Sequence, residues 1–191
     1  MKRAILILTT LIITFSVSAQ TITYLGVPLS GNINEFTKKL AFKGTKVNKA
    51  ISNQLEDGAI AFDVTLFSYP CFGYVEYNTS TRNVFEGVLM FQISSTLKEF
   101  TDFVDYWSNQ INDKYSKGIF TCDYEEDEYN SLPADHYTIY STSNNKRIGD
   151  IYLYMKIVEY SKASDRGKFM FHVMYLNNEA PSFEEQMKDL Y

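Results

Sequence analysis

Cysteine and histidine are scarce in this sequence, with two of each among 191 residues. A histidine-rich metal site is therefore excluded. The sequence also lacks a G-x-S-x-G nucleophile elbow, an H-E-x-x-H pair and a glycine-rich phosphate loop. With none of these motifs present, we expect no cofactor. The apolar content of the sequence is ordinary and no low-complexity stretch interrupts it, so we expect a chain that is folded throughout.

The first 19 residues have the three-part layout of a secretory signal peptide. Two basic residues precede an apolar run over residues 4–17, and small residues follow up to a cleavage point after Ala19. The apolar run is shorter than the roughly 20 residues that span a bilayer, so a membrane anchor is the less favoured alternative. We expect residues 1–19 to be removed and the mature chain to be exported, periplasmic or extracellular, without membrane insertion.

Acidic residues outnumber basic ones in the expected mature chain. Two of the 18 basic residues lie in the signal peptide, so 16 remain against 23 acidic residues, a formal charge of −7. This balance argues against nucleic acid and anionic membrane surfaces as partners. The acidic run Asp123–Tyr129 (DYEEDEY) is interpreted as a solvated loop. Calcium binding is the alternative, but the run lacks the ligand spacing and the glycine of an EF-hand loop.

Capping pairs and apolar stripes predict two amphipathic helices. Asn32 and Glu35 begin the first, which ends before Gly44, while Thr96 and Glu99 begin a longer one that runs to about Tyr115. The tripeptide EFT occurs at both starts, 64 residues apart, which suggests an internal repeat. The residues expected in the core are Phe36, Leu40, Phe100, Val104, Trp107 and Ile111.

Consecutive strand-like segments follow each helix, which predicts an α+β fold with antiparallel sheet and two principal helices. We expect a single domain over 20–191, with possible halves at 22–93 and 94–177 and a short helix at 182–190. The expected strands are 59–67, 72–77, 84–93, 118–123, 136–142, 147–160 and 168–176.

A resemblance rests on the stretch GVPL…EFTKKL…KGT (residues 26–45), the three strands after it, and the helix ending INDKYSKG (residues 111–118). These features resemble uncharacterised exported proteins of Gram-negative bacteria. Their helix-then-antiparallel-sheet units are similar to those of β-lactamase inhibitory protein and of the small lipoprotein subunit of the outer-membrane β-barrel assembly machinery. The resemblance implies this fold and a tendency to bind proteins, and it implies no catalytic residue.

The two cysteines allow one disulfide, Cys71–Cys122, because an exported chain enters an oxidising compartment; two buried thiols are the alternative. Cys122 and His136 also suggest a catalytic pair, with Asp123 or Asp135 as the acid. The acidic residues after Cys122 disfavour its thiolate, so this small extracytoplasmic hydrolase is the less favoured hypothesis.

Tyrosines are abundant in the second half of the chain and suggest a binding face. If Asn144-Asn145 is a two-residue hairpin turn, Tyr137 lies opposite Tyr152, and Tyr154 continues the same face. Tyrosine is also common on the wet side of any sheet. The favoured hypothesis is a non-enzymatic exported protein that binds an unknown protein or glycan through this face. A subunit of an envelope assembly is a further alternative.

Overall fold

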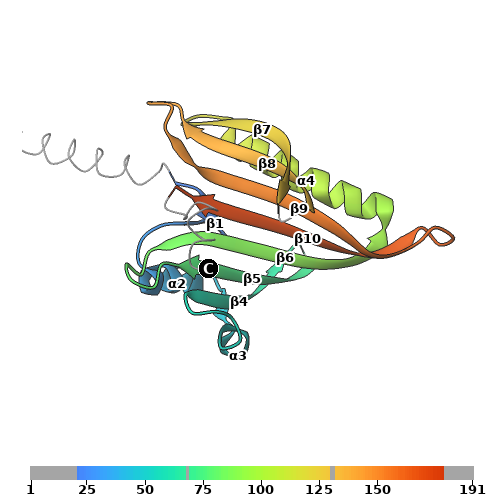
Figure 1. Ribbon diagram of the computed structural model, residues 1–191, viewed down its shortest axis with the longest axis horizontal. Coiled ribbons are helices and arrows are strands. Elements are labelled where there is room, and N and C mark those ends of the chain that lie inside the picture. Colours follow the sequence, from blue (N-terminus) through green and yellow to red (C-terminus); the bar gives the residue numbers. More distant parts are fainter. Residues whose placement is uncertain (1–20, 68, 130–131, 179–191) are drawn as a thin grey trace, which may run out of the picture.

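The computed structural model describes residues 21–67, 69–129 and 132–178 (Figure 1). They form an eight-stranded antiparallel sheet of order β3-β4-β5-β6-β10-β9-β8-β7, a small hairpin of β1 and β2, and three helices, of which α2 and α4 pack on one face of the sheet. The expected α+β class is confirmed. The predicted signal peptide at 1–19 and the predicted helix at 182–190 lie outside the described residues.

The strands β1 to β3 have two residues each, whereas β4 to β10 have eight or more. The helices are α2 (Ile33–Phe42), α3 (Lys49–Ser52) and α4 (Leu97–Tyr115). The strands are β1 (Thr23–Tyr24), β2 (Val27–Pro28), β3 (Lys46–Val47), β4 (Ala59–Leu66), β5 (Tyr69–Tyr77), β6 (Val84–Thr96), β7 (Phe120–Tyr129), β8 (Leu132–Ser141), β9 (Arg147–Ser161) and β10 (Arg166–Asn177).

The helix starts follow the capping residues. Thr96 and Glu99 form a complete capping box at the start of α4, which confirms that prediction. The side chain of Asn32 accepts the N–H of Asn34 at 2.9 Å and so caps α2. Both helices then place an apolar stripe against the sheet, and all six residues expected in the core are buried.

Helices α2 and α4 cover the same face of the sheet. Residues two apart on a strand share a face, so Gly87 and Phe91 of β6 point to the same side. The ring centroid of Phe91 lies 5.8 Å from that of Trp107 in α4. Tyr24 lies against Gly87 and also contacts Phe36 of α2, with ring centroids 6.4 Å apart. One hydrophobic core therefore joins both helices to the sheet.

Tyr24 packs on the backbone of two strands because glycine stands beneath it. A Cβ atom at Gly87 would lie 2.5 Å from Cδ2 of Tyr24, and one at Gly73 would lie 2.6 Å from the Tyr24 hydroxyl. That hydroxyl donates to the carbonyl of Val88 at 2.9 Å. The buried hydroxyl is thereby satisfied, and the hairpin of β1 and β2 is fixed to the centre of the sheet.

The sheet consists of two four-stranded meanders. Strands β3 to β6 follow α2, with α3 between β3 and β4. Strands β7 to β10 follow α4, and the meanders join where β6 pairs with β10. Figure 1 shows α4 lying along the β7–β10 part of the sheet and α2 near the other part. We call the face turned away from α2 and α4 the distal face; it extends across both meanders.

Candidate functional site

Four neighbouring strands place aromatic, methionine and histidine side chains on the distal face. Directly paired residues on adjacent strands share a face of the sheet. The register pairs Phe72 of β5 with Met90 of β6, and Met90 with His172 of β10. His172 in turn pairs with Tyr154 of β9. The half-exposed residues of this group, here called the aromatic band, are Phe72, Tyr74, Met90, Tyr152, Tyr154 and His172.

Tyr137 is not part of this face, so the expected register was wrong at this position. Tyr137 pairs with Ile151 rather than Tyr152, is 1% exposed, and lies on the helix side with Tyr124. The loop between β8 and β9 spans residues 142–146, and the register with β9 shifts within β8, between Ile139 and Tyr140. A shift of one residue moves every following side chain to the other face. Tyr152 and Tyr154 do share the distal face.

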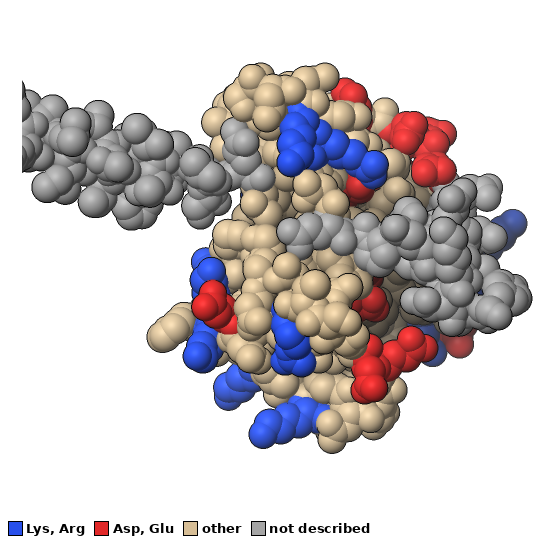
Figure 2. Space-filling view, turned by 60° about the vertical axis from the view of Figure 1, so that its left-hand side comes forward, with Lys and Arg blue, Asp and Glu red and all other residues tan. Residues whose placement is uncertain are grey.

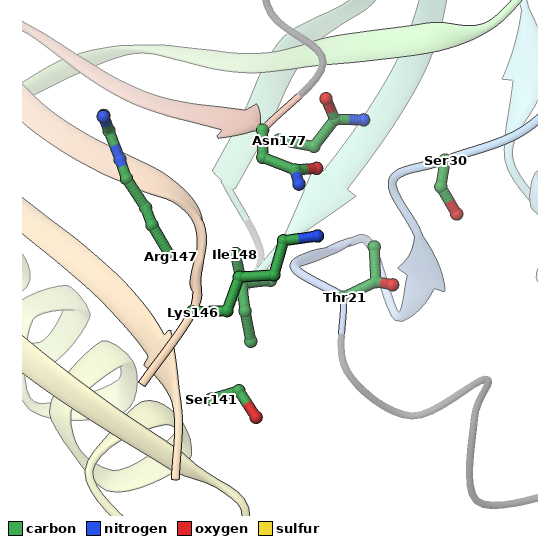
Figure 3. Close-up of a pocket in the computed structure, with 8 residues that line it drawn as sticks. Thr21, Ser30, Ser141, Lys146, Arg147, Ile148 and Asn177 are labelled. Atoms are coloured by element: carbon green, nitrogen blue, oxygen red, sulfur yellow. The ribbon is translucent and has the colours of Figure 1, made fainter. Parts of the chain in front are cut away.

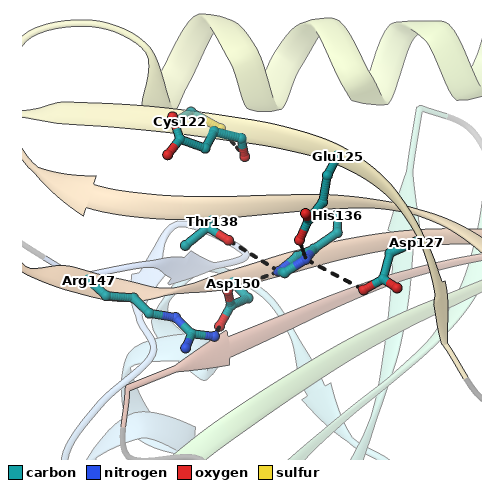
Figure 4. A network of polar contacts seen from close by, with 8 residues as sticks. Cys122, Glu125, Asp127, His136, Thr138, Arg147 and Asp150 are labelled. Carbon is teal, nitrogen blue, oxygen red and sulfur yellow. Dashed lines mark hydrogen bonds and ion pairs between the residues drawn. The ribbon is translucent and has the colours of Figure 1, made fainter.

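A polar cluster adjoins the aromatic band, centred on His136 of β8 (Figure 4). His136 is 7% exposed and pairs directly with Glu125 of β7. Its Nδ1 lies 2.8 Å from Oε1 of Glu125 and 3.7 Å from Oδ2 of Asp127. Its Nε2 lies 3.0 Å from Oδ1 of Asp150 and 3.3 Å from the hydroxyl of Thr138. Three carboxylates thus surround one buried imidazole.

Neighbouring side chains hold this imidazole in place. The ring of Tyr152 stacks on His136 with centroids 4.2 Å apart and an interplanar angle of 9°. The guanidinium of Arg147 donates to Asp150, the carboxylate on the other side of the ring. The cluster is therefore ordered by packing as well as by charge, and through Tyr152 it is continuous with the aromatic band.

The charges in the cluster shift the pKa values of its members. Burial alone lowers the pKa of His136, but hydrogen bonds and charge from Asp150 and Glu125 outweigh burial and raise that pKa above its usual value. Burial alone raises the pKa of Asp150, but hydrogen bonds from His136 and Arg147 hold it below its usual value. Asp150 is thus an ionised acceptor at neutral pH.

A second buried acid lies on the distal face of β6. Glu86 is 7% exposed and pairs directly with Glu76 of β5. Burial, and then the like charge of Glu76, raises the pKa of Glu86 to about 8. Glu86 is therefore largely protonated at neutral pH.

The acidic run at 123–129 was expected to be a loop, but it lies within β7. Its backbone pairs with β8 in unbroken register from Phe120–Ser141 to Tyr129–Leu132. Pairing with β8 outweighs the low strand propensity of aspartate and glutamate. The alternation of a strand then places Asp123, Glu125 and Asp127 together on the distal face.

Cys122 and His136 lie on opposite faces of the sheet. Cys122 pairs with Ile139 and packs against the helix-side core, whereas His136 points to the distal face (Figure 4). Burial and then the charge of Asp123 raise the pKa of the Cys122 thiol to about 11. A thiol that is protonated and has no histidine within reach on its own face is not an activated nucleophile. The geometry therefore opposes the hydrolase hypothesis.

The predicted disulfide is also wrong, because Cys71 and Cys122 are free thiols. Cys71 lies in β5 and Cys122 in β7, with β6, β10, β9 and β8 between them. Neighbouring strands are about 4.8 Å apart, so these positions are separated by on the order of 20 Å. A disulfide requires Cα atoms within about 7 Å. The alternative was two buried thiols; both cysteines are free thiols, but they are only partly buried.

A small polar pocket lies at one end of the sheet, near the start of the described chain (Figure 3). Its volume is about 190 Å³, and side chains that line it include Ser30, Lys146, Arg147 and Asn177. Sites for small organic ligands usually enclose about 300–1,000 Å³. This pocket is therefore small for a substrate.

Charged side chains are interspersed on the end of the molecule shown in Figure 2. Among the described residues visible there, lysines and arginines form separate groups rather than one continuous stripe. Continuous basic surfaces are the usual footprint of nucleic-acid binding. Acidic residues are more densely grouped than basic ones in the sequence, and the acidic run of β7 places three of them on the distal face.

Comparison with family models, curated proteins and solved structures finds no match for this chain. In the part of the chain that the structure describes, no helix is both long enough and apolar enough to cross a membrane.

The complete His136 cluster was not predictable from any local pattern in the sequence. Asp150 is 14 residues from His136 in the sequence and belongs to another strand. No short sequence motif links His136 to Asp150, Glu125 or Asp127. The signal that could have located part of the cluster is the acidic run at 123–129. In a strand, every second residue of this run lies on the same face, which brings Asp123, Glu125 and Asp127 together.

Proposed function

We propose that this chain is an exported, non-enzymatic binding protein that captures a protein partner on the distal face of its sheet. The observation that carries the proposal is the aromatic band. The helices bury one face of the sheet, while the band leaves tyrosine, phenylalanine, methionine and histidine side chains half exposed on the other. Aromatic and methionine side chains are enriched where protein surfaces associate.

The chemistry of the partner follows from the charges beside the band. Asp123, Glu125 and Asp127 lie exposed on the distal face of β7, at the edge of the sheet. The expected mature chain carries a formal charge of −7, from 16 basic and 23 acidic residues. A partner with an apolar patch bordered by lysine or arginine complements this surface, and opposite charges accelerate its association.

Two further observations support export and protein binding. The first 19 residues have the pattern of a signal peptide, which supports a periplasmic or extracellular location. The resemblance to exported proteins with the units of β-lactamase inhibitory protein implies a tendency to bind proteins. A subunit of an envelope assembly, the alternative, would use the same surface to contact its neighbours.

Capture from an envelope extract tests the proposal with matched variants. The test variant carries Phe72→Ser, Met90→Ser and Tyr154→Ser, all on the distal face. The control is Phe42→Ser, because Phe42 is an aromatic residue on α2 that is 92% exposed. We expect the wild-type protein and the control to retain the same protein, and the test variant to lose it while keeping its circular dichroism spectrum.

Two outcomes would contradict the proposal. Equal capture by the folded test variant would show that the band is not the binding surface. Capture that survives protease treatment of the extract but is lost after glycosidase treatment would identify a glycan rather than a protein partner.

A further inference from the structure

The His136 cluster has the donor set and the spacing of a metal site. One nitrogen and two carboxylate oxygens, from His136, Glu125 and Asp127, all lie within 4.8 Å of one another. Zinc forms bonds of about 2.0–2.1 Å to such atoms, so two of its ligands in a tetrahedral site are about 3.3 Å apart. The distances from Nδ1 to the two carboxylates, 2.8 and 3.7 Å, bracket that value.

The strands position these three side chains without help from a loop. Glu125 and Asp127 are two residues apart on β7 and so share a face, and His136 lies directly opposite Glu125 on β8. Both carboxylates keep substantial exposure, 66% for the side chain of Glu125 and 47% for that of Asp127. Coordination would require these carboxylates to shift by only a few tenths of an ångström, and water has access to complete the ligand set.

The partner of the second imidazole nitrogen orients His136 for coordination. Arg147 donates to one oxygen of Asp150, and the other oxygen lies 3.0 Å from Nε2 of His136, so this geometry places the Nε2 proton in a hydrogen bond to Asp150. The lone pair of the neutral ring is then on Nδ1, the atom that faces Glu125 and Asp127. Carboxylate–histidine–metal arrangements of this kind fix the tautomer and the ring orientation of a metal ligand.

We propose that His136, Glu125 and Asp127 bind a divalent first-row transition-metal ion, with Asp150 as the positioning residue behind His136. A ligand set with one imidazole and two carboxylates favours Zn²⁺ over Ca²⁺ and Mg²⁺, which prefer oxygen ligands alone. The ion would lie at the sheet edge beside the aromatic band and would add positive charge next to the acidic residues there. This goes beyond the proposed binding function and does not depend on it.

The test is a Zn²⁺ titration of the untagged protein in competition with a chromophoric chelator. We expect one tight site per chain, with affinity reduced by about 10-fold or more in His136→Gln and in the double variant Glu125→Gln/Asp127→Asn. Replacing the positioning residue, Asp150→Asn, should weaken binding by about 10–100-fold. Circular dichroism confirms that each variant remains folded.

The matched control is Glu126→Gln. Glu126 lies between the two carboxylate ligands on β7 but points to the opposite face, so its replacement removes one carboxylate charge from β7 without removing a ligand. We expect its zinc affinity to equal that of the wild type. Cobalt adds a spectroscopic test: the Co²⁺ complex should show d–d absorption that disappears in His136→Gln.

Three results would overturn the proposal. One is the absence of a stoichiometric zinc site in the wild-type protein. The cluster would then be an ion-pair network in which His136 supplies the positive charge near Glu125, Asp127 and Asp150. Another is equal weakening by Glu126→Gln and by the ligand variants, which would indicate diffuse attraction to the acidic strand. The third is tighter binding of Ca²⁺ than of Zn²⁺, which would exclude the imidazole as a ligand.

Discussion

The buried acid Glu86 should make the protein less stable as the pH rises through neutrality. Its pKa in the folded protein is about 8, compared with 4.5 for the free side chain. The folded state holds this proton more tightly than the unfolded state does. The resulting contribution to the free energy of unfolding is complete below about pH 4.5, decreases between about pH 4.5 and pH 8, and is lost above about pH 8. At 1.36 kcal/mol per pH unit, the shift corresponds to at most about 5 kcal/mol.

Glu86→Gln isolates this effect, since glutamine has nearly the same shape and no charge. Urea unfolding from pH 4 to pH 9 should give equal free energies for the two proteins at pH 4. Above pH 8 the variant should be more stable by several kcal/mol, up to the limit of about 5 kcal/mol set by the shift. Glu126→Gln is the control for general charge, as Glu126 is exposed. Parallel curves for wild type and Glu86→Gln would refute the assignment of Glu86 as a protonated buried acid.

Three further predictions concern packing and the thiols. Phe100→Ala should cost about 3–5 kcal/mol of unfolding free energy, because the ring stacks on Phe169 with centroids 4.4 Å apart; a loss below about 1 kcal/mol in urea unfolding would contradict this. Gly87→Ala should cost about 1–3 kcal/mol, since the new Cβ overlaps Tyr24, and an unchanged thermal midpoint would argue against that contact. Both cysteines should react with a thiol reagent after unfolding without reductant, and a monomeric chain with no reactive thiol would contradict the sheet order.

The elements of this fold were predictable because they depend on local sequence. The Thr96 capping box and the apolar stripes lie within single helices, and each of the seven expected strands overlaps one of β4 to β10. The β7 strand was recognised only at its start, because its acidic half gains its hydrogen bonds from β8 and not from its own propensity.

The faces of the sheet were harder to predict than its strands. One register shift beside Tyr140 decides that Tyr137 is buried under α4, and nothing in the local sequence specifies that shift. Pairing across strands likewise decides which acids reach His136. The candidate site is thus a product of register, which a single sequence specifies weakly.

Hydroxyl-radical footprinting of the complex with the captured partner tests the central claim most directly. The distal face is predicted to be the binding surface, so Met90 and Tyr154 should be protected when the partner is bound. Phe42 and Tyr106, exposed on α2 and α4, should be labelled equally in the free and bound protein. Protection of Phe42 and Tyr106, with Met90 and Tyr154 labelled as in the free protein, would contradict the account.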